Sequence, residues 1–263
     1  MELWHYFLLA FLGIISGTLN VLAGGGSLLT LPAMIFMGMD GAVANGTNRV
    51  AILAQNVTAV GSFRSLGFSD MRLSFSLALA ALPGGICGAI LGTMARGELF
   101  NRILGLVLIG VLVLMGLQWL RKEKAGAPAG DEETTVAVEP VRPSRRQMIL
   151  GHAAMFAIGF YGGFIQAGVG FLLMAALHRL MGLDLVRVNM HKVFIVGLFT
   201  FAALIVFAVR GQVLWIPGFA LAAGNALGGW IGSRLSVFKG ESWIRTTLWI
   251  ALLLMAVKLL WPS

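Results

Sequence analysis

The chain has 263 residues, of which 58% are hydrophobic and only 11% are charged, and its mean hydropathy is +0.89. Soluble domains carry about 25% charged residues, so this composition excludes an ordinary cytosolic protein and indicates an integral membrane protein. The formal net charge is +8. In a membrane protein we expect such an excess of Lys and Arg in loops on the cytoplasmic side, and no nucleic-acid partner.

Eight apolar runs approach the roughly 20 residues that a helix needs to cross a bilayer. They cover 3–22, 48–66, 73–95, 99–120, 148–166, 188–209, 213–234 and 243–261. The first run carries Glu2 where a signal peptide has basic residues, so we expect a retained helix. A stretch rich in Ala, Gly, Pro and charges of both signs, 121–147, should be a flexible cytoplasmic linker. The predicted organisation is a first transmembrane repeat at 1–120, this linker, and a second transmembrane repeat at 148–263.

An internal repeat relates the two halves at a constant offset of 144 residues. Chance matches between Leu-rich helices are common, but matched Gly, Asn and Asp at one offset are not. The matched pairs include Gly24 with Gly168, Gly26 with Gly170, Asp40 with Asp184, Asn45 with Asn189, Gly84 with Gly228, Gly85 with Gly229 and Gly88 with Gly232.

Each half also holds a short apolar piece after its glycine run, at 27–37 and 171–181. At ~1.5 Å per residue, such a piece reaches only part of the way across a ~30 Å core. If both pieces are re-entrant, the basic residues divide ten to nine between the two membrane faces; if each completes a fifth crossing, they divide fourteen to five. The second division obeys the positive-inside rule. We therefore expect an all-α polytopic fold of two inverted repeats, each with four long transmembrane helices plus a short helix after a Gly-rich break, and with both termini outside.

The two glycine breaks, 23–27 (AGGGS) and 167–171 (AGVGF), are the first candidate site. A helix that begins after each break would point unpaired N–H groups and its positive dipole end into the protein, which favours an anion. Irregular backbone at membrane depth also implies a cavity. The alternative is close helix packing through small residues, which we prefer for Gly84, Gly85, Gly88, Gly92, Gly228, Gly229 and Gly232. The predicted backbone donors are Gly24, Gly25, Gly26, Ser27, Gly168 and Gly170.

Polar side chains inside or beside the apolar runs form the second candidate site, because a polar group in hydrocarbon must face a partner or a wet cavity. They are Asn20, Asn45, Asn48, Arg49, Gln55, Asn56, Gln166, Asn189, His191, Lys192 and Asn225. For Arg49 and Lys192, a snorkelling anchor at the interface is an equal alternative. For the Asn and Gln residues, the alternative is hydrogen bonding between helices. We expect the pocket to be lined by Asn48, Gln55, Gln166, His191 and Lys192, with His191 as the best titrating group.

Carboxylates fall near the ends of the runs, so a carboxylate proton relay is not supported. These residues are Asp40, Asp70, Glu98, Asp184 and Glu241. A pocket of amides and cations suits an anion better than a metal ion, and we expect no metal site and no cofactor. The single cysteine, Cys87, should be a small buried packing residue. No hydrolase elbow and no two-His metal spacing occurs, so we do not expect an enzyme. A cation carrier and a non-transporting membrane partner or assembly subunit remain as alternatives.

With these residues in view, the sequence resembles the TauE/SafE (sulfite exporter) family of bacterial membrane transporters. The resemblance covers nearly the whole chain apart from the linker. It rests on 17–32 (GTLNVLAGGGSLLTLP), Thr47 with Asn48, 159–171 (GFYGGFIQAGVGF), 182–192 (GLDLVRVNMHK) and 224–235 (GNALGGWIGSRL).

The resemblance implies a duplicated, multi-pass carrier in the bacterial inner membrane, often an exporter, for small sulfur-containing or organic anions such as sulfite or sulfonates. Some relatives carry an acidic residue where this chain has Asn20, which puts the coupling ion in doubt. The expected partners are a small anionic solute and the lipid bilayer, and a homo-oligomer stays open.

Overall fold

The computed structural model describes residues 2–95, 97–124 and 144–238, and every regular element within them is helical. The first half contains α1 (Leu3–Ala23), α2 (Ser27–Phe36), α3 (Gly41–Ser65), α4 (Met71–Gly92) and α5 (Gly97–Lys124). The second half contains α6 (Arg145–Phe164), α7 (Val169–Ala175), the π-helical turn η1 (Ala176–Leu180), α8 (Leu185–Val209) and α9 (Trp215–Phe238). The predicted run at 243–261 and residues 125–143 of the predicted linker lie outside the described residues. The all-α prediction is confirmed for the described part of the chain.

Three of the described helices, α1, α4 and α8, are long and apolar enough to cross a membrane by length and composition. Their outward faces expose large apolar side chains, which include Phe7, Phe11, Phe75, Leu79, Phe201 and Ile205. A surface of this kind is suited to lipid. Cys87 is also exposed, on α4, so the prediction of a buried cysteine is wrong. In a membrane protein an apolar stretch can face lipid as readily as the core, and the sequence around Cys87 does not distinguish the two.

Aspartates fix where three of the long helices begin. Asp40 accepts from the amides of Ala42 and Val43, so α3 begins at Gly41 and not near 48 as the apolar run predicted. The polar residues at the start of α3 interrupt the apolar run, although they do not interrupt the helix. Asp70 caps α4 in the same way, and N-caps of this type stabilise a helix by about 1 kcal/mol.

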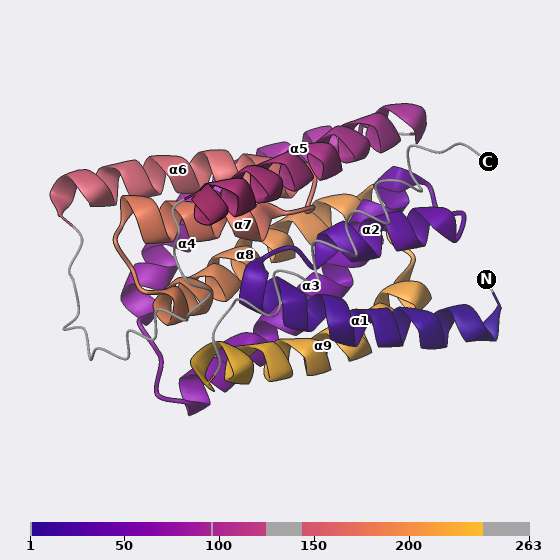
Figure 1. The fold of residues 1–263 in the computed structure, drawn as a ribbon. Helices are drawn as coiled ribbons and strands as arrows, with labels where there is room; N and C mark the ends of the chain where they lie inside the picture. The colour runs from indigo at the N-terminus through magenta and orange to yellow at the C-terminus, as the bar shows by residue number, and fades with distance from the viewer. Residues whose placement is uncertain (1, 96, 125–143, 239–263) are drawn as a thin grey trace.

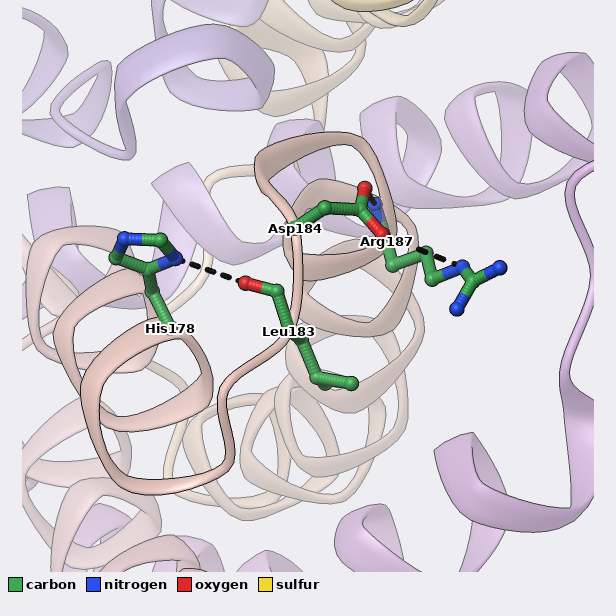
Figure 2. A network of polar contacts seen from close by, with 4 residues as sticks. All are labelled: His178, Leu183, Asp184 and Arg187. Atoms are coloured by element: carbon green, nitrogen blue, oxygen red, sulfur yellow. Dashed lines mark hydrogen bonds and ion pairs between the residues drawn. The ribbon is translucent and has the colours of Figure 1, made fainter. Parts of the chain in front are cut away.

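The turn before α8 is held by side chains on both sides of it, as Figure 2 shows. The Nδ1 atom of His178 lies 2.8 Å from the carbonyl oxygen of Leu183, and because a carbonyl only accepts, Nδ1 carries the proton. Asp184 accepts from the backbone amide of Arg187 at 2.9 Å and also pairs with its guanidinium at 3.3 Å. These contacts hold the start of α8.

The helices pack through glycines at very short range. α1 lies beside α9, and α4 lies beside α6 (Figure 1). A Cβ added at Gly84, Gly88 or Gly92 would overlap or crowd the backbone of α6, and one added at Gly228 or Gly232 would meet that of α1. Gly85 abuts the side chain of Phe199, and Gly229 abuts the carbonyl oxygen of Gln55. The packing interpretation of these seven glycines is therefore confirmed.

The directions of the helices follow from their contacts. α3 and α8 run antiparallel, because Arg49 near the start of α3 stacks on Phe207 near the end of α8, while Asn56 meets Gly197. α9 runs parallel to α3, since Thr47 accepts from the amide of Leu214 and Thr58 donates to the carbonyl of Ala226. α1 in turn runs parallel to α9. α1 and α3 thus start at the same end of the bundle, which we call the near end; the end where α3 finishes is the far end. Because α1 runs away from the near end and α3 starts there again, α2 leads the chain back from the end of α1 to the near end.

The element boundaries of the two halves recur at the offset seen in the sequence. α3 spans Gly41–Ser65 and α8 spans Leu185–Val209, while α4 begins at Met71 and α9 at Trp215. Glycines in the left-handed region recur with the same spacing: Gly24 and Gly168, Gly38 and Gly182, Gly67 and Gly211.

Candidate functional site: two helix breaks and the cavity between them

The two glycine breaks meet in direct backbone contact. α1 ends at Ala23, Gly24 has a left-handed φ of 82°, and α2 begins at Ser27. Gly168 has a φ of 71°, and α7 follows it. A Cβ added at Gly24 would overlap the backbone of Gly170, and the reverse is also true. Segments far apart in the sequence thus come together at one point.

One predicted donor at the breaks is already engaged. The amide of Gly24 donates to the carbonyls of Asn20 at 2.9 Å and Leu19 at 3.2 Å. It therefore closes the end of α1 and is not offered to a ligand in this conformation, contrary to the expectation for this residue. Gly170 lies inside α7, one residue after its start, and not in the break itself.

At the second break, side chains of α3 satisfy the last carbonyls of α6. The guanidinium of Arg49 donates to the carbonyls of Gly162, at 3.3 Å, and Gly163, and to Oε1 of Gln166 at 3.1 Å. The side-chain amide of Asn45 donates to the carbonyl of Phe164 at 2.9 Å. The final carbonyls of a helix lack partners within the helix, and a cation near them also complements the dipole. Arg49 and Asn45 therefore allow α6 to end inside the protein.

Lys192 from α8 does the same at the first break. Its Nζ donates to the carbonyl of Val21, in the last turn of α1, and to Oδ1 of Asn189, both at 2.7 Å. Its relative exposure is 2%, and that of Arg49 is 0%. The snorkelling alternative is therefore wrong for both cations.

A small cavity lies between the breaks, at the contact of α1, α3, α7 and α8. The centre of a water molecule can occupy about 10 Å³ of it, which is room for roughly one water. Among the described residues that line it, none is Asp or Glu; they are Asn20, Gln55, Asn56, Val169, Gly170, Lys192, Val193 and Val196.

The polar lining of this cavity is rich in hydrogen-bond donors. Asn20 donates from Nδ2 to Oε1 of Gln55 at 3.1 Å. The Nδ2 atom of Asn56 is buried and has no hydrogen-bond partner among the described residues. With the ammonium of Lys192 beside them, these amides form a positive, acid-free lining, which stabilises a negative charge.

The predicted site residues separate into three groups. Gln55, Gly170 and Lys192 line the cavity. Gln166 accepts a hydrogen bond from Arg49, and Asn48 accepts one from the hydroxyl of Thr30 at 2.8 Å. Both residues are therefore at the breaks but outside the cavity. The remaining residues at the breaks are buried and do not line it: Gly24, Gly25, Gly26, Ser27 and Gly168.

His191 lies elsewhere. Its Nδ1 is 2.8 Å from the hydroxyl of Ser74, which links α8 to α4. Ser74 also borders a second hollow, at the far end, together with Val60, Arg64, Asp70 and Met190. Met190 and Val193 belong to one apolar cluster with Val60 at its edge; Val193 lines the cavity, whereas Met190 and Val60 border the hollow.

Two cavity residues, Asn20 and Asn56, belong to the polar set of the sequence but were not selected for the pocket. Asn56 directly follows Gln55, and this position could have indicated that Asn56 also lines the cavity. α3 meets both α8 and α9 there, so consecutive residues face different helices and both stay buried.

A bundle of apolar helices in which two helices break beside a small cavity with buried polar side chains is an arrangement typical of membrane transporters. The sequence comparisons agree: the family model of the sulfite exporter TauE/SafE matches residues 9–259. The chain belongs to the TauE/SafE family of membrane transporters.

The relatives are transporters by name, and they match over most of their length. The chain is 29% identical over 258 residues to "Probable membrane transporter protein ORF9" of Sinorhizobium sp, covering 97% of this chain and 93% of the relative. It is 29% identical over 260 residues to the Escherichia coli K12 protein "Probable membrane transporter protein YfcA", covering 97% and 89%. A Haemophilus influenzae transporter protein is 27% identical over 252 residues, covering 95% and 92%. No solved structure matches the chain.

Proposed function

We propose that this protein is a multi-pass carrier of the bacterial inner membrane that moves a small anion, such as sulfite or a small sulfonate, by alternating access at the two helix breaks. The observation that carries the proposal is the cavity between the breaks, lined by a buried lysine and three side-chain amides and, among the described residues, by no carboxylate. Its small volume corresponds to an occluded state in which the anion must enter by a movement of the helices.

The mechanism includes an inverted repeat, which the helix directions support. The corresponding helices α3 and α8 run antiparallel, and α1 and α3 start at the same end, as five crossings per half require. The far end holds Arg64 in the last turn of α3 and Arg187 in the first turn of α8, while Arg210 lies at the near end directly after α8. If the short helices were re-entrant, Arg64 and Arg210 would lie on the same face of the membrane. We therefore propose that the far end and the linker are cytoplasmic, with both termini outside. A reporter fused to the C-terminus and active in the cytoplasm would contradict this topology.

The transport test is anion flux into proteoliposomes. Labelled sulfite and labelled methanesulfonate should enter vesicles that contain the protein. Lys192→Met should raise the KM by about 10–100-fold, since a hydrogen bond to a charged group contributes about 1.5–3 kcal/mol. Arg187→Met is the matched control, because it removes a cation from the same helix at a partly exposed ion pair away from the cavity. An equal rise in the KM of both variants would contradict the assignment of the cavity as the anion-binding site.

The same preparations separate the alternatives. For an anion carrier, methanesulfonate should raise the melting temperature of the purified protein, and Mn²⁺ or Zn²⁺ should not. The opposite pattern would indicate a cation carrier. A folded protein that moves neither anion and is stabilised by neither class of solute would favour a non-transporting membrane partner.

A further inference from the structure

The cavity between the breaks has a counterpart at the positions related to it by the repeat. Shifting its lining residues by 144 positions leads from Asn56 to Thr200, from Lys192 to Asn48, and from Val193 to Arg49. The same shift leads from Gly170 to Gly26 at the first break. All of these counterparts are buried, and they lie on helices that correspond to those around the cavity.

Three of the counterparts carry buried hydrogen-bond donors that have no partner among the described residues. They are Nδ2 of Asn48, Nε of Arg49 and the hydroxyl of Thr200, and each of these residues has a relative exposure of 0%. Nε2 of Gln166, which contacts Arg49 through its oxygen, is a fourth such donor. More than nine in ten buried polar groups normally find a partner, so four unused donors, on Gln166 and on three residues that the repeat relates to the cavity, indicate a ligand.

From this correspondence we propose a second anion-binding position, formed by Asn48, Arg49, Gln166 and Thr200 beside the second break. The inference rests on the proposed function. When two inverted repeats exchange their conformations, the cavity now found beside Lys192 closes and its counterpart beside Arg49 opens toward the other face of the membrane. Donors that lack partners in the present state then bind the anion.

The ligand class follows from the donor set. The guanidinium of Arg49, two side-chain amides and a hydroxyl present donors and one fixed positive charge, and they match an oxyanion with several acceptor oxygens. Two rings lie next to Arg49 in this structure. Phe199, the counterpart of Gln55, packs its ring against Gly162, whose carbonyl accepts from Arg49, and the centre of the Phe207 ring lies 4.6 Å from the guanidinium carbon. The second position is therefore smaller and less polar at its rim than the first, and it opens only if these rings move.

Thiol labelling tests the proposal. Cys87 is the only cysteine, so a Cys87→Ala protein provides a cysteine-free background. Into it we would introduce Asn56→Cys, at the cavity, and in a separate protein Thr200→Cys, at the proposed position. The reagent is 2-sulfonatoethyl methanethiosulfonate, which is anionic and does not cross membranes. It is applied to sealed vesicles of each orientation.

The expected result is labelling of Asn56→Cys from one face and of Thr200→Cys from the opposite face. Methanesulfonate at ten times its half-saturating concentration should slow both reactions by about tenfold, because it then occupies most of the sites. Ser233→Cys is the matched control, since Ser233 is fully buried and its hydroxyl already donates to the carbonyl of Trp230. It should react from neither face.

Two results would contradict the second position, provided that anion flux in the parent protein persists. In the first, Thr200→Cys is labelled from neither face. In the second, it is labelled from the same face as Asn56→Cys and methanesulfonate does not protect it. Loss of flux in the Cys87→Ala parent would instead contradict the proposed function, and with it this inference. If Thr200→Cys does not fold, Ile52→Cys, the counterpart of Val196, reports on the same position with the same two outcomes.

Discussion

Both helix breaks are stabilised by the same kind of interaction, but the cation differs. In each, a helix that stops inside the protein has its last carbonyls bound by a buried cation from a long helix of the other half: Lys192 on α8 binds the end of α1, and Arg49 on α3 binds the end of α6. The two cations do not occupy matched positions, because the repeat relates Lys192 to Asn48 and Arg49 to Val193. The shared requirement is the burial of a helix terminus, which any nearby cation can satisfy.

The surroundings of the two cations differ. Arg49 is held by two carbonyls, a glutamine oxygen and the ring of Phe207, and it lines neither the cavity between the breaks nor the second hollow. Lys192 binds one carbonyl and one amide oxygen and also borders the cavity. A planar guanidinium with five fixed donors suits several fixed acceptors, whereas an ammonium can reorient its three donors toward a solute. The comparison favours a structural role for Arg49, and it agrees with the proposed binding role of Lys192.

The largest effect should come from removing Arg49. Arg49→Leu leaves two carbonyls and the oxygen of Gln166 buried without donors, and each such group costs about 1–3 kcal/mol. We expect a loss of several kcal/mol, of which Arg49→Lys restores part. Lys192→Met should cost less, about 1–2 kcal/mol, because water in the cavity can reach the groups that it leaves. Thermal unfolding in detergent measures all three. A larger loss for Lys192→Met would reverse the assignment of roles.

The contact between the breaks should be the next most sensitive feature. Gly24→Ala and Gly170→Ala each insert a methyl group into the other break, and overpacking of this kind costs about 1–3 kcal/mol. Gly24→Ala adds the cost of a left-handed residue.

Gly38→Ala is the matched control for that prediction. Gly38 has a φ of 88°, but a Cβ there would meet nothing within 4 Å, so only the conformational cost of about 1 kcal/mol remains. If Gly38→Ala and Gly170→Ala lower the unfolding temperature equally, the close contact of the breaks is not important for stability.

Much of this architecture could be predicted from the sequence. The apolar runs predicted the long helices, and the glycine runs predicted the start of α2 and, within two residues, the start of α7. Both signals are local, because they depend on glycines and on a break in the apolar pattern. The start of α3 was missed, since Asn45, Asn48 and Arg49 look like the end of a loop. They are polar because they face another helix terminus, which is a fact of tertiary structure.

The site was predicted less completely for the same reason. Of the residues selected from the sequence, Gln55, Gly170 and Lys192 line the cavity, but His191 was chosen for its chemistry and points to Ser74 on α4 instead. The sequence shows that residues 189, 191 and 192 are polar. It does not show which of them faces α1 and which faces α4, because the rotation of α8 is set by its cap at Asp184 and by packing.

A change of charge within the cavity should have a moderate effect on binding and little on the fold. Asn20→Asp places a carboxylate beside Lys192 and removes the donor that Asn20 offers to Gln55. Repulsion between this carboxylate and the substrate should weaken methanesulfonate binding by about tenfold, the equivalent of roughly 1.4 kcal/mol. Isothermal titration at pH 7 measures the change. Asn225→Asp, on α9 and outside the cavity, is the control, and a tenfold loss there as well would mean that overall charge and not the cavity governs affinity.

The smallest effect is expected at the link between α8 and α4. Ser74→Ala removes the hydroxyl that lies 2.8 Å from Nδ1 of His191, so it should cost about 1 kcal/mol of stability. His191→Gln can keep a hydrogen bond to Ser74 and should cost less. Because neither side chain borders the cavity, both variants should transport sulfite with a KM within about twofold of the parent, a difference well below 1 kcal/mol. A rise of tenfold or more in the KM of folded His191→Gln protein would show that the substrate also visits the far side of α8, and Lys192 would then not be the only residue of that helix that binds the anion.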